Sequence, residues 1–217
     1  MISASSGATL NIQSTIPSTA ASASSGVLIN FNSSDTGIVV LSASNLYTVA
    51  TRVDYGTLKV GSANSLSTTS GITVKSSASL DLAGYTVNKP ITLEGGTVIS
   101  SSGSGVLAGG ITLTANSILA ADSSATLTVS TTKITGSTRN ITIGSGSNLG
   151  TVILSDKAVT DSLSYTGTTS VISGATLNLK INLACTTVST CFNSSYSGAG
   201  TIILEPATSG WATAIGA

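Results

Sequence analysis

Histidine is absent from this 217-residue sequence, and charged residues make up only 7% of it. Without histidine the chain lacks the commonest general base, the usual zinc ligand and an imidazole-based pH switch. The eight basic and eight acidic residues are scattered and balance to zero, so no basic stripe can neutralise nucleic-acid phosphates or bind an anionic membrane surface. We therefore expect no nucleic-acid partner.

Long apolar runs are also missing. No run approaches the roughly 20 residues that span a bilayer, so we expect no membrane insertion by this chain. The first ten residues, MISASSGATL, lack the basic start and the apolar stretch of a secretory signal. Two interpretations remain: export by something outside this chain, or a fragment or mature form of a longer protein.

Cysteine occurs only twice, as Cys185 and Cys191 in the segment CTTVSTC. Two buried thiols would behave as small apolar groups, whereas a disulfide would close a short loop, as in exported proteins. The polar segment between the two cysteines favours the disulfide. Two thiolates with no nearby histidine cannot complete a tetrahedral metal site, so we expect no metal and no cofactor.

Short aliphatic–polar–aliphatic triplets recur throughout the chain, framed by Gly, Ser or Asn. Alternation with period two places the aliphatic side chains on one face of a strand and the polar ones on the other. Pairs of triplets such as those that start at Leu58 and Leu80, or at Ile91 and Ile111, lie 20 to 22 residues apart, which is typical of a solenoid with two or three short strands per coil. The triplets are LNI 10–12, LKV 58–60, ITV 72–74, LDL 80–82, ITL 91–93, ITL 111–113, LTV 127–129, ITI 141–143, LNL 177–179 and IIL 202–204.

An antiparallel sandwich is the alternative all-β fold, since it also has short, closely spaced strands. It needs tight hairpins, for which Asn-Gly and Asp-Gly turns are the strongest signal. None of the twelve asparagines and six aspartates precedes a glycine. The sequence therefore predicts an all-β fold: one right-handed parallel β-helix over residues 1–217, with roughly nine or ten coils of about 20–25 residues.

The expected core is narrow and aliphatic, and the outward positions should form Thr, Ser or Asn ladders between coils. The segment SGATLN occurs at 6–11 and again at 173–178. We interpret it as a corner followed by a strand, in which Gly makes the turn, Ala8 and Leu10 point inward, and Thr9 and Asn11 point outward.

Residues 37–66, GIVVLSASNLYTVATRVDYGTLKVGSANSL, resemble the autotransporter-associated β-strand repeat of bacterial passenger domains. Residues 70–84, SGITVKSSASLDLAG, are similar to the usual continuation of that repeat, so the resemblance covers about residues 37–84. Three family glycines are replaced, by Ala43, Val49 and Ala50. The matching positions are Leu41-Ser42, Asn45, Tyr47-Thr48, Thr51, Val53, Gly56-Thr57-Leu58, Val60-Gly61, Ser62-Ala63 and Leu66.

The resemblance implies a right-handed parallel β-helix that is exported through the outer membrane and displayed at, or released from, the bacterial cell surface. A complete autotransporter would also carry a C-terminal outer-membrane barrel. The chain would then be a fragment of a longer passenger or an independent secreted relative. Closely placed cysteines such as Cys185 and Cys191 are typical of such passengers.

Three functions are compatible with these features. The first is a non-enzymatic structural or adhesive scaffold that contacts a host or cell-surface glycan or protein. The second is a filament subunit that stacks end to end on copies of itself. The third, an enzyme acting on polysaccharide, needs clustered acids. Acids on adjacent coils could meet, and Asp54 and Asp81, about one coil apart, are the least implausible pair. We expect solvated outward charges instead and assign no catalytic residue.

Contact residues follow from the first two functions. For end-to-end or surface contacts we name Trp211, Tyr196, Leu10 and Ile12. The irregular loop at 194–200 and the scattered tyrosines are further candidates, although each tyrosine could equally be an ordinary corner or surface residue. The five tyrosines are Tyr47, Tyr55, Tyr85, Tyr165 and Tyr196.

Overall fold

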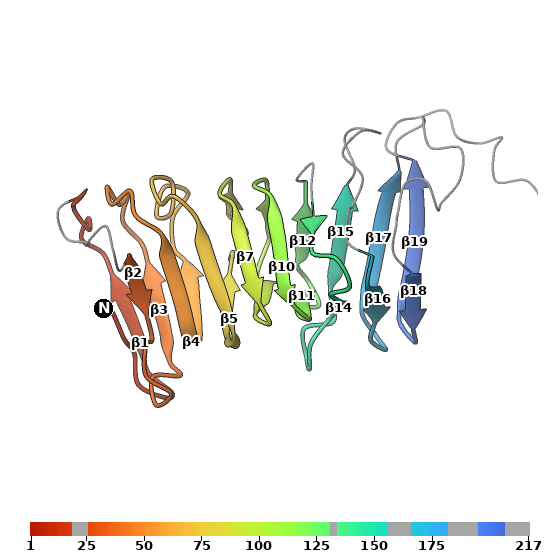
Figure 1. Cartoon of the computed structure of the whole chain (residues 1–217), viewed down its shortest axis with the longest axis horizontal. Helices are drawn as coiled ribbons and strands as arrows, with labels where there is room; N and C mark the ends of the chain where they lie inside the picture. The colour runs from red at the N-terminus through yellow and green to blue at the C-terminus, as the bar shows by residue number, and fades with distance from the viewer. Residues whose placement is uncertain (19–25, 131–133, 156–165, 182–194, 207–217) are drawn as a thin grey trace, which may run out of the picture.

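Parallel strands form a single stack along the length of the molecule, from β1 at one end to β18 and β19 at the other (Figure 1). The computed structural model of the chain describes residues 1–18, 26–130, 134–155, 166–181 and 195–206. The strands are β1 (Thr9–Ile12), β2 (Val27–Ile29), β3 (Ile38–Leu41), β4 (Thr51–Val60), β5 (Ile72–Asp81), β6 (Thr86–Val87), β7 (Ile91–Glu94), β8 (Thr97–Ser100), β9 (Ser104–Leu107), β10 (Ile111–Ala115), β11 (Ser117–Ala121), β12 (Thr126–Val129), β13 (Ile134–Thr135), β14 (Ile141–Ile143), β15 (Thr151–Ser155), β16 (Thr168–Val171), β17 (Thr176–Ile181), β18 (Ser195–Gly198) and β19 (Thr201–Pro206). Across these ranges, no helix has the length and apolar character needed to span a membrane.

The strands divide among three faces. The long face follows the order β1-β3-β4-β5-β8-β11-β14-β16-β18, and sheet B follows the order β6-β9-β12-β15-β17-β19. The short face consists of β2, β7, β10 and β13 with the first halves of β4 and β5. Consecutive strands such as β7, β8 and β9 belong to three different faces, and β10, β11 and β12 stack on them in the same order. The prediction of a parallel solenoid with two or three strands per coil is confirmed.

The solenoid makes about seven turns, slightly fewer than the nine or ten coils expected. The prediction assumed one coil length throughout the chain. In the middle of the rod Ser79 pairs with Thr97, but towards the ends Thr9 pairs with Ile38 and Thr142 with Ser170. Longer coils at both ends use more residues per turn.

The core consists of columns of aliphatic side chains that repeat once per coil. All members of the inward column of the long face are fully or almost fully buried except the first, Leu10, which is 37% exposed. A rod this narrow needs few aromatic residues, which agrees with the aromatic content of 4%. This column contains Leu10, Val39, Leu58, Leu80, Val98, Leu119, Ile143 and Val171.

The outward positions form the expected hydroxyl ladders. On the short face Thr73, Thr92, Thr112 and Thr135 occupy one column, and the Thr135 hydroxyl donates to the Thr112 hydroxyl at 3.3 Å. Sheet B carries a second column, whose members are Ser104, Thr126, Thr151, Thr176 and Thr201.

The two SGATLN segments adopt the same local structure on different faces. Gly7 and Gly174 have φ angles of 74° and 85°, which favour glycine, and each is followed by a strand. The first copy forms β1 of the long face and the second forms β17 of sheet B. The segment therefore specifies a corner and a strand but not the face to which the strand belongs.

Candidate functional site

The strongest concentration of charge in the described chain surrounds an irregularity in the pairing of β4 with β5. The register between β4 and β5 shifts between Val53 and Tyr55, so Asp54 of β4 faces a β-bulge in β5 formed by Lys75 and Ser76. Bulges re-aim side chains and are frequent beside functional sites. A surface pocket of about 370 Å³ opens here, which we call the charged pocket; its lining residues are Phe31, Arg52, Asp54, Tyr55, Lys75, Ser76 and Ser77.

Asp54 is the electrostatic centre of the charged pocket. Its side chain is only 6% exposed. The Arg52 guanidinium binds both carboxylate oxygens, with Nε at 2.7 Å from Oδ1 and Nη2 at 2.6 Å from Oδ2. The Lys75 ammonium lies 3.7 Å from Oδ1. The hydrogen bond from Arg52 to Asp54 is the largest of the influences that raise the pKa of Arg52 above its usual value.

Phe31 completes the pocket from the preceding coil. The Arg52 guanidinium lies 5.7 Å from the centroid of its ring, at cation–π distance. The ring is nevertheless 44% exposed, and the side chains of Arg52 and Lys75 are 37% and 40% exposed. The pocket therefore presents an aromatic ring, two cations and the hydroxyls of Ser76 and Ser77 to solvent.

The chain bends sharply next to the pocket. Gly56 has a φ of 59°, and a Cβ at this position would collide with the carbonyl oxygen of Gly37 and the side-chain amide of Asn30. Asn30 is itself fully buried, accepts from the Ala4 N–H at 2.8 Å and donates to the Gly37 carbonyl at 2.9 Å. These contacts fix the bend that separates the short-face half of β4 from its long-face half.

The structure does not bring the predicted acid pair together. Asp81 pairs with Lys59 on the long face, whereas Asp54 lies at the bulge opposite Lys75 and Ser76. The expectation that both acids are solvated outward charges is wrong, because they are only 6% and 5% exposed. Each is buried because its carboxylate is satisfied by nearby donors.

Asp81 has its own set of donors. One oxygen accepts from the N–H groups of Ala83 (2.9 Å) and Ser101 (3.0 Å), and the other accepts from the Ser101 hydroxyl at 2.6 Å. The Lys59 ammonium lies 3.3 Å away. Ala83 has a φ of 48°, an uncommon conformation for a non-glycine residue. Asp81 therefore stabilises the turn between the long face and sheet B.

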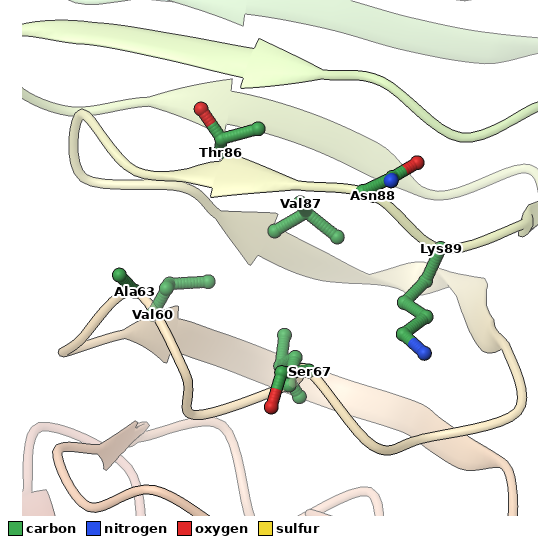
Figure 2. Close-up of a pocket in the computed structure, with 8 residues that line it drawn as sticks. Val60, Ala63, Ser67, Thr86, Val87, Asn88 and Lys89 are labelled. Atoms are coloured by element: carbon green, nitrogen blue, oxygen red, sulfur yellow. The ribbon is translucent and has the colours of Figure 1, made fainter.

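A second pocket, of about 270 Å³, lies between β6 and the loop at 61–70 of the preceding coil (Figure 2). Its floor is apolar, since Val60, Leu66 and Val87 are at most 4% exposed. Val87 points from β6 toward the loop, and the Lys89 side chain extends in the same direction (Figure 2). We call this cavity the β6 pocket; Ala63, Ser67, Thr86 and Asn88 also line it.

The predicted contact residues do not form one site. Leu10 is 37% exposed, Ile12 is half-buried at the same end of the rod, and Tyr196 is half-buried near the other end, packed against the core. Trp211, Cys185 and Cys191 lie outside the described residues, so the predicted disulfide stays a prediction.

Among the other tyrosines, Tyr47 is not a contact residue, because it is fully buried, and its hydroxyl lies 3.0 Å from that of Thr51. Burial raises the pKa of Tyr47. Tyr55 lines the charged pocket and Tyr85 is 36% exposed, whereas Tyr165 lies outside the described residues.

Sequence reasoning missed the charged pocket. The available signal was the alternation Arg-Val-Asp at 52–54 in a chain with so few charges. Within the described ranges no group of three or more His, Cys, Asp or Glu residues could hold a metal ion. A comparison of the chain with family models, curated proteins and solved structures finds no match.

Proposed function

We propose that this protein is a non-enzymatic, extracellular scaffold, displayed on or secreted from a bacterial cell, that adheres to cell-surface glycan or protein through the charged pocket. The observation that carries the proposal is the stack itself. Parallel coils continue from one end of the described chain to the other around one aliphatic core. Such a rod is suited to holding a surface site at a distance.

The charged pocket supports the adhesive part of the proposal. Its volume of about 370 Å³ lies in the usual range for ligand pockets. Aromatic residues, including Phe, and arginines are enriched at protein interfaces relative to the rest of the surface. Asp54 holds Arg52 by a bidentate contact, so the guanidinium is positioned before a ligand arrives.

The test is binding of the fluorescently labelled protein to fixed epithelial cells. We expect saturable binding that falls at least about fivefold in the double variant Phe31→Ala/Arg52→Ala and is unchanged in Thr142→Ala, a half-buried outward position on the long face. Periodate treatment of the cells, which destroys glycan diols, separates a glycan receptor from a protein receptor. The absence of saturable binding, or equal binding by the double variant, would contradict adhesion through this pocket.

A filament subunit is the second candidate. Leu10, at the first strand of the long face, and Leu204, at the last strand of sheet B, are 37% and 41% exposed. The residues that stack on them in the neighbouring coils, Val39 and Leu179, are buried. Among the described strands, only the long face could continue between copies, from β18 to β1, because sheet B begins at β6. Electron microscopy over a range of concentrations should show filaments that Leu10→Glu abolishes; separate short rods at every concentration would exclude this candidate.

A further inference from the structure

At the β6 pocket, sheet B lacks the strand that would pair with the second edge of β6. β6 pairs with β9 on one edge only, and it is the last strand of the sheet on that side. In the preceding coil the corresponding place is taken by the loop at 61–70, which contains no strand. An edge strand with no neighbour is a template for another strand.

The loop at 61–70 forms its hydrogen bonds with the coil before it and not with β6. The Asn45 side chain donates to the Ser65 carbonyl at 2.8 Å, and the Thr68 hydroxyl donates to the Asn45 carbonyl at 2.9 Å. The Ser70 N–H likewise donates to the Val49 carbonyl of the coil before. Although both segments are fully described, no hydrogen bond joins the loop at 61–70 to β6.

The free edge of β6 carries backbone donors and acceptors. The N–H groups of Val106 and Ala108 donate to the carbonyls of Tyr85 and Val87, so these carbonyls face β9. Neighbouring residues of a strand direct their backbone groups to opposite edges. The N–H and C=O of Thr86, and the N–H of Asn88, therefore face the loop and the pocket.

The register of sheet B predicts which types of residue an added strand would need at each position. A residue opposite Val87 would extend the inward column and place its side chain on the apolar floor of the β6 pocket. A residue opposite Thr86 would face outward and should be polar. The inward column that it would extend contains Val87, Leu107, Val129, Leu154, Leu179 and Leu204.

Charge complementarity specifies the next contact. Lys89 lies just beyond the end of β6 and extends toward the loop (Figure 2). Among the described residues no carboxylate forms an ion pair with it, and no acid lines the pocket. A carboxylate two residues after the aliphatic side chain would lie opposite Lys89 in a parallel strand.

We propose that the free edge of β6 docks an extended peptide segment of a partner protein in parallel register, with an aliphatic residue in the β6 pocket and an acidic residue opposite Lys89. Backbone hydrogen bonds to Thr86 and Asn88 provide affinity, and the pocket and Lys89 provide specificity. The proposal goes beyond adhesion through the charged pocket and does not depend on it.

The test uses fluorescein-labelled peptides of sequence Ser-Thr-Val-Thr-Glu-Ser with blocked ends, measured by fluorescence anisotropy against the full chain. In parallel register the N–H of the peptide's valine donates to the Thr86 carbonyl. N-methylation of this valine should weaken binding at least about tenfold. N-methylation of the threonine before it, whose N–H faces away from β6, is the matched control and should change binding little.

Substitutions in the protein test the charge contact. Lys89→Ala should weaken binding by up to about fivefold, as expected for a partly exposed ion pair. Lys180→Ala, at a half-buried lysine elsewhere on sheet B, should leave binding unchanged. The absence of saturable peptide binding, or equal binding by the N-methylvaline peptide, would overturn the proposal.

Hydrogen exchange supplies a test that needs no ligand. The amides of Thr86 and Asn88 should exchange in the free protein as fast as loop amides, and they should become protected when the peptide is added. If both amides are already protected in the free protein, the edge is occupied and the proposal is wrong. Neither measurement involves the cells used to test adhesion, so the two proposals can fail separately.

Discussion

Removal of the Asp81 carboxylate should destabilise the fold more than removal of any other charged side chain that the structure describes outside the charged pocket. The variant Asp81→Ala leaves the N–H groups of Ala83 and Ser101 without their acceptor in a site that is 5% exposed. Hydrogen bonds to a charged group contribute about 1.5–3 kcal/mol each. The ion pair with Lys59 adds at most about 1 kcal/mol, because the lysine side chain is 35% exposed.

The two N–H hydrogen bonds and the ion pair together give an expected loss of about 3–7 kcal/mol in the free energy of unfolding. Asp81→Asn keeps an oxygen for the two N–H groups and should lose about 1–2 kcal/mol. Asp122→Ala is the matched control, since this half-buried acid also lies in a turn that leads into sheet B. It should change stability by less than about 0.5 kcal/mol.

Urea titration followed by far-UV circular dichroism measures these differences. At a slope near 2 kcal/mol per molar urea, Asp81→Ala should lower the midpoint by about 1.5–3.5 M with the slope unchanged. An Asp81→Ala midpoint indistinguishable from that of Asp122→Ala would refute the reasoning, because water would then be satisfying the freed donors.

Three further predictions concern the core, a buried phenol and a corner glycine. Leu80→Ala should cost about 2–5 kcal/mol in the same titration, since it removes a fully buried member of the long-face column. Burial raises the pKa of Tyr47 above the usual tyrosine value of 10.0, so its contribution to stability is complete below pH 10.0 and should be lost as pH rises through the higher pKa of the folded state. In an ultraviolet titration, the tyrosine that ionises at the highest pH should be absent from Tyr47→Phe. If that ionisation remains in the variant, the assignment to Tyr47 is wrong. Gly109→Ala should prevent normal folding, because its Cβ would collide with the Lys89 backbone of the neighbouring coil. The expected result is a loss of the β-sheet circular dichroism signal. A native-like spectrum would mean that the two coils can move apart to accommodate the methyl group.

Much of the fold was predictable because strand formation here depends on local pattern. Nine of the ten aliphatic triplets lie within strands, and the tenth, at 80–82, extends one residue past the end of β5. Which side chains point inward follows from the same alternation, as for Leu10 and Leu177 in the two SGATLN copies. The predicted number of coils was too high because the coils differ in length. The loops between strands set the length of each coil, and the strand pattern does not reveal it.

The charged pocket could not be predicted in the same way. Arg52 and Asp54 are close in sequence, but Phe31 and Lys75 reach them from neighbouring coils, and the bulge adds a residue to one strand only. The burial of Tyr47 and of Asp81 was missed for a similar reason. Their partners, Thr51 for the phenol and Ser101 for the carboxylate, depend on how the chain turns between strands.

The sequence by itself determined that this protein is a parallel solenoid with an aliphatic core and hydroxyl-rich faces, because alternation and the choice of turn residues are properties of a few adjacent positions. Only the tertiary structure decided which face each strand joins, where charges meet, and that sheet B of the described chain begins at β6 with a free edge. Those features depend on the number of residues between stacked strands, which places side chains from different coils in contact and has no signature in any short segment.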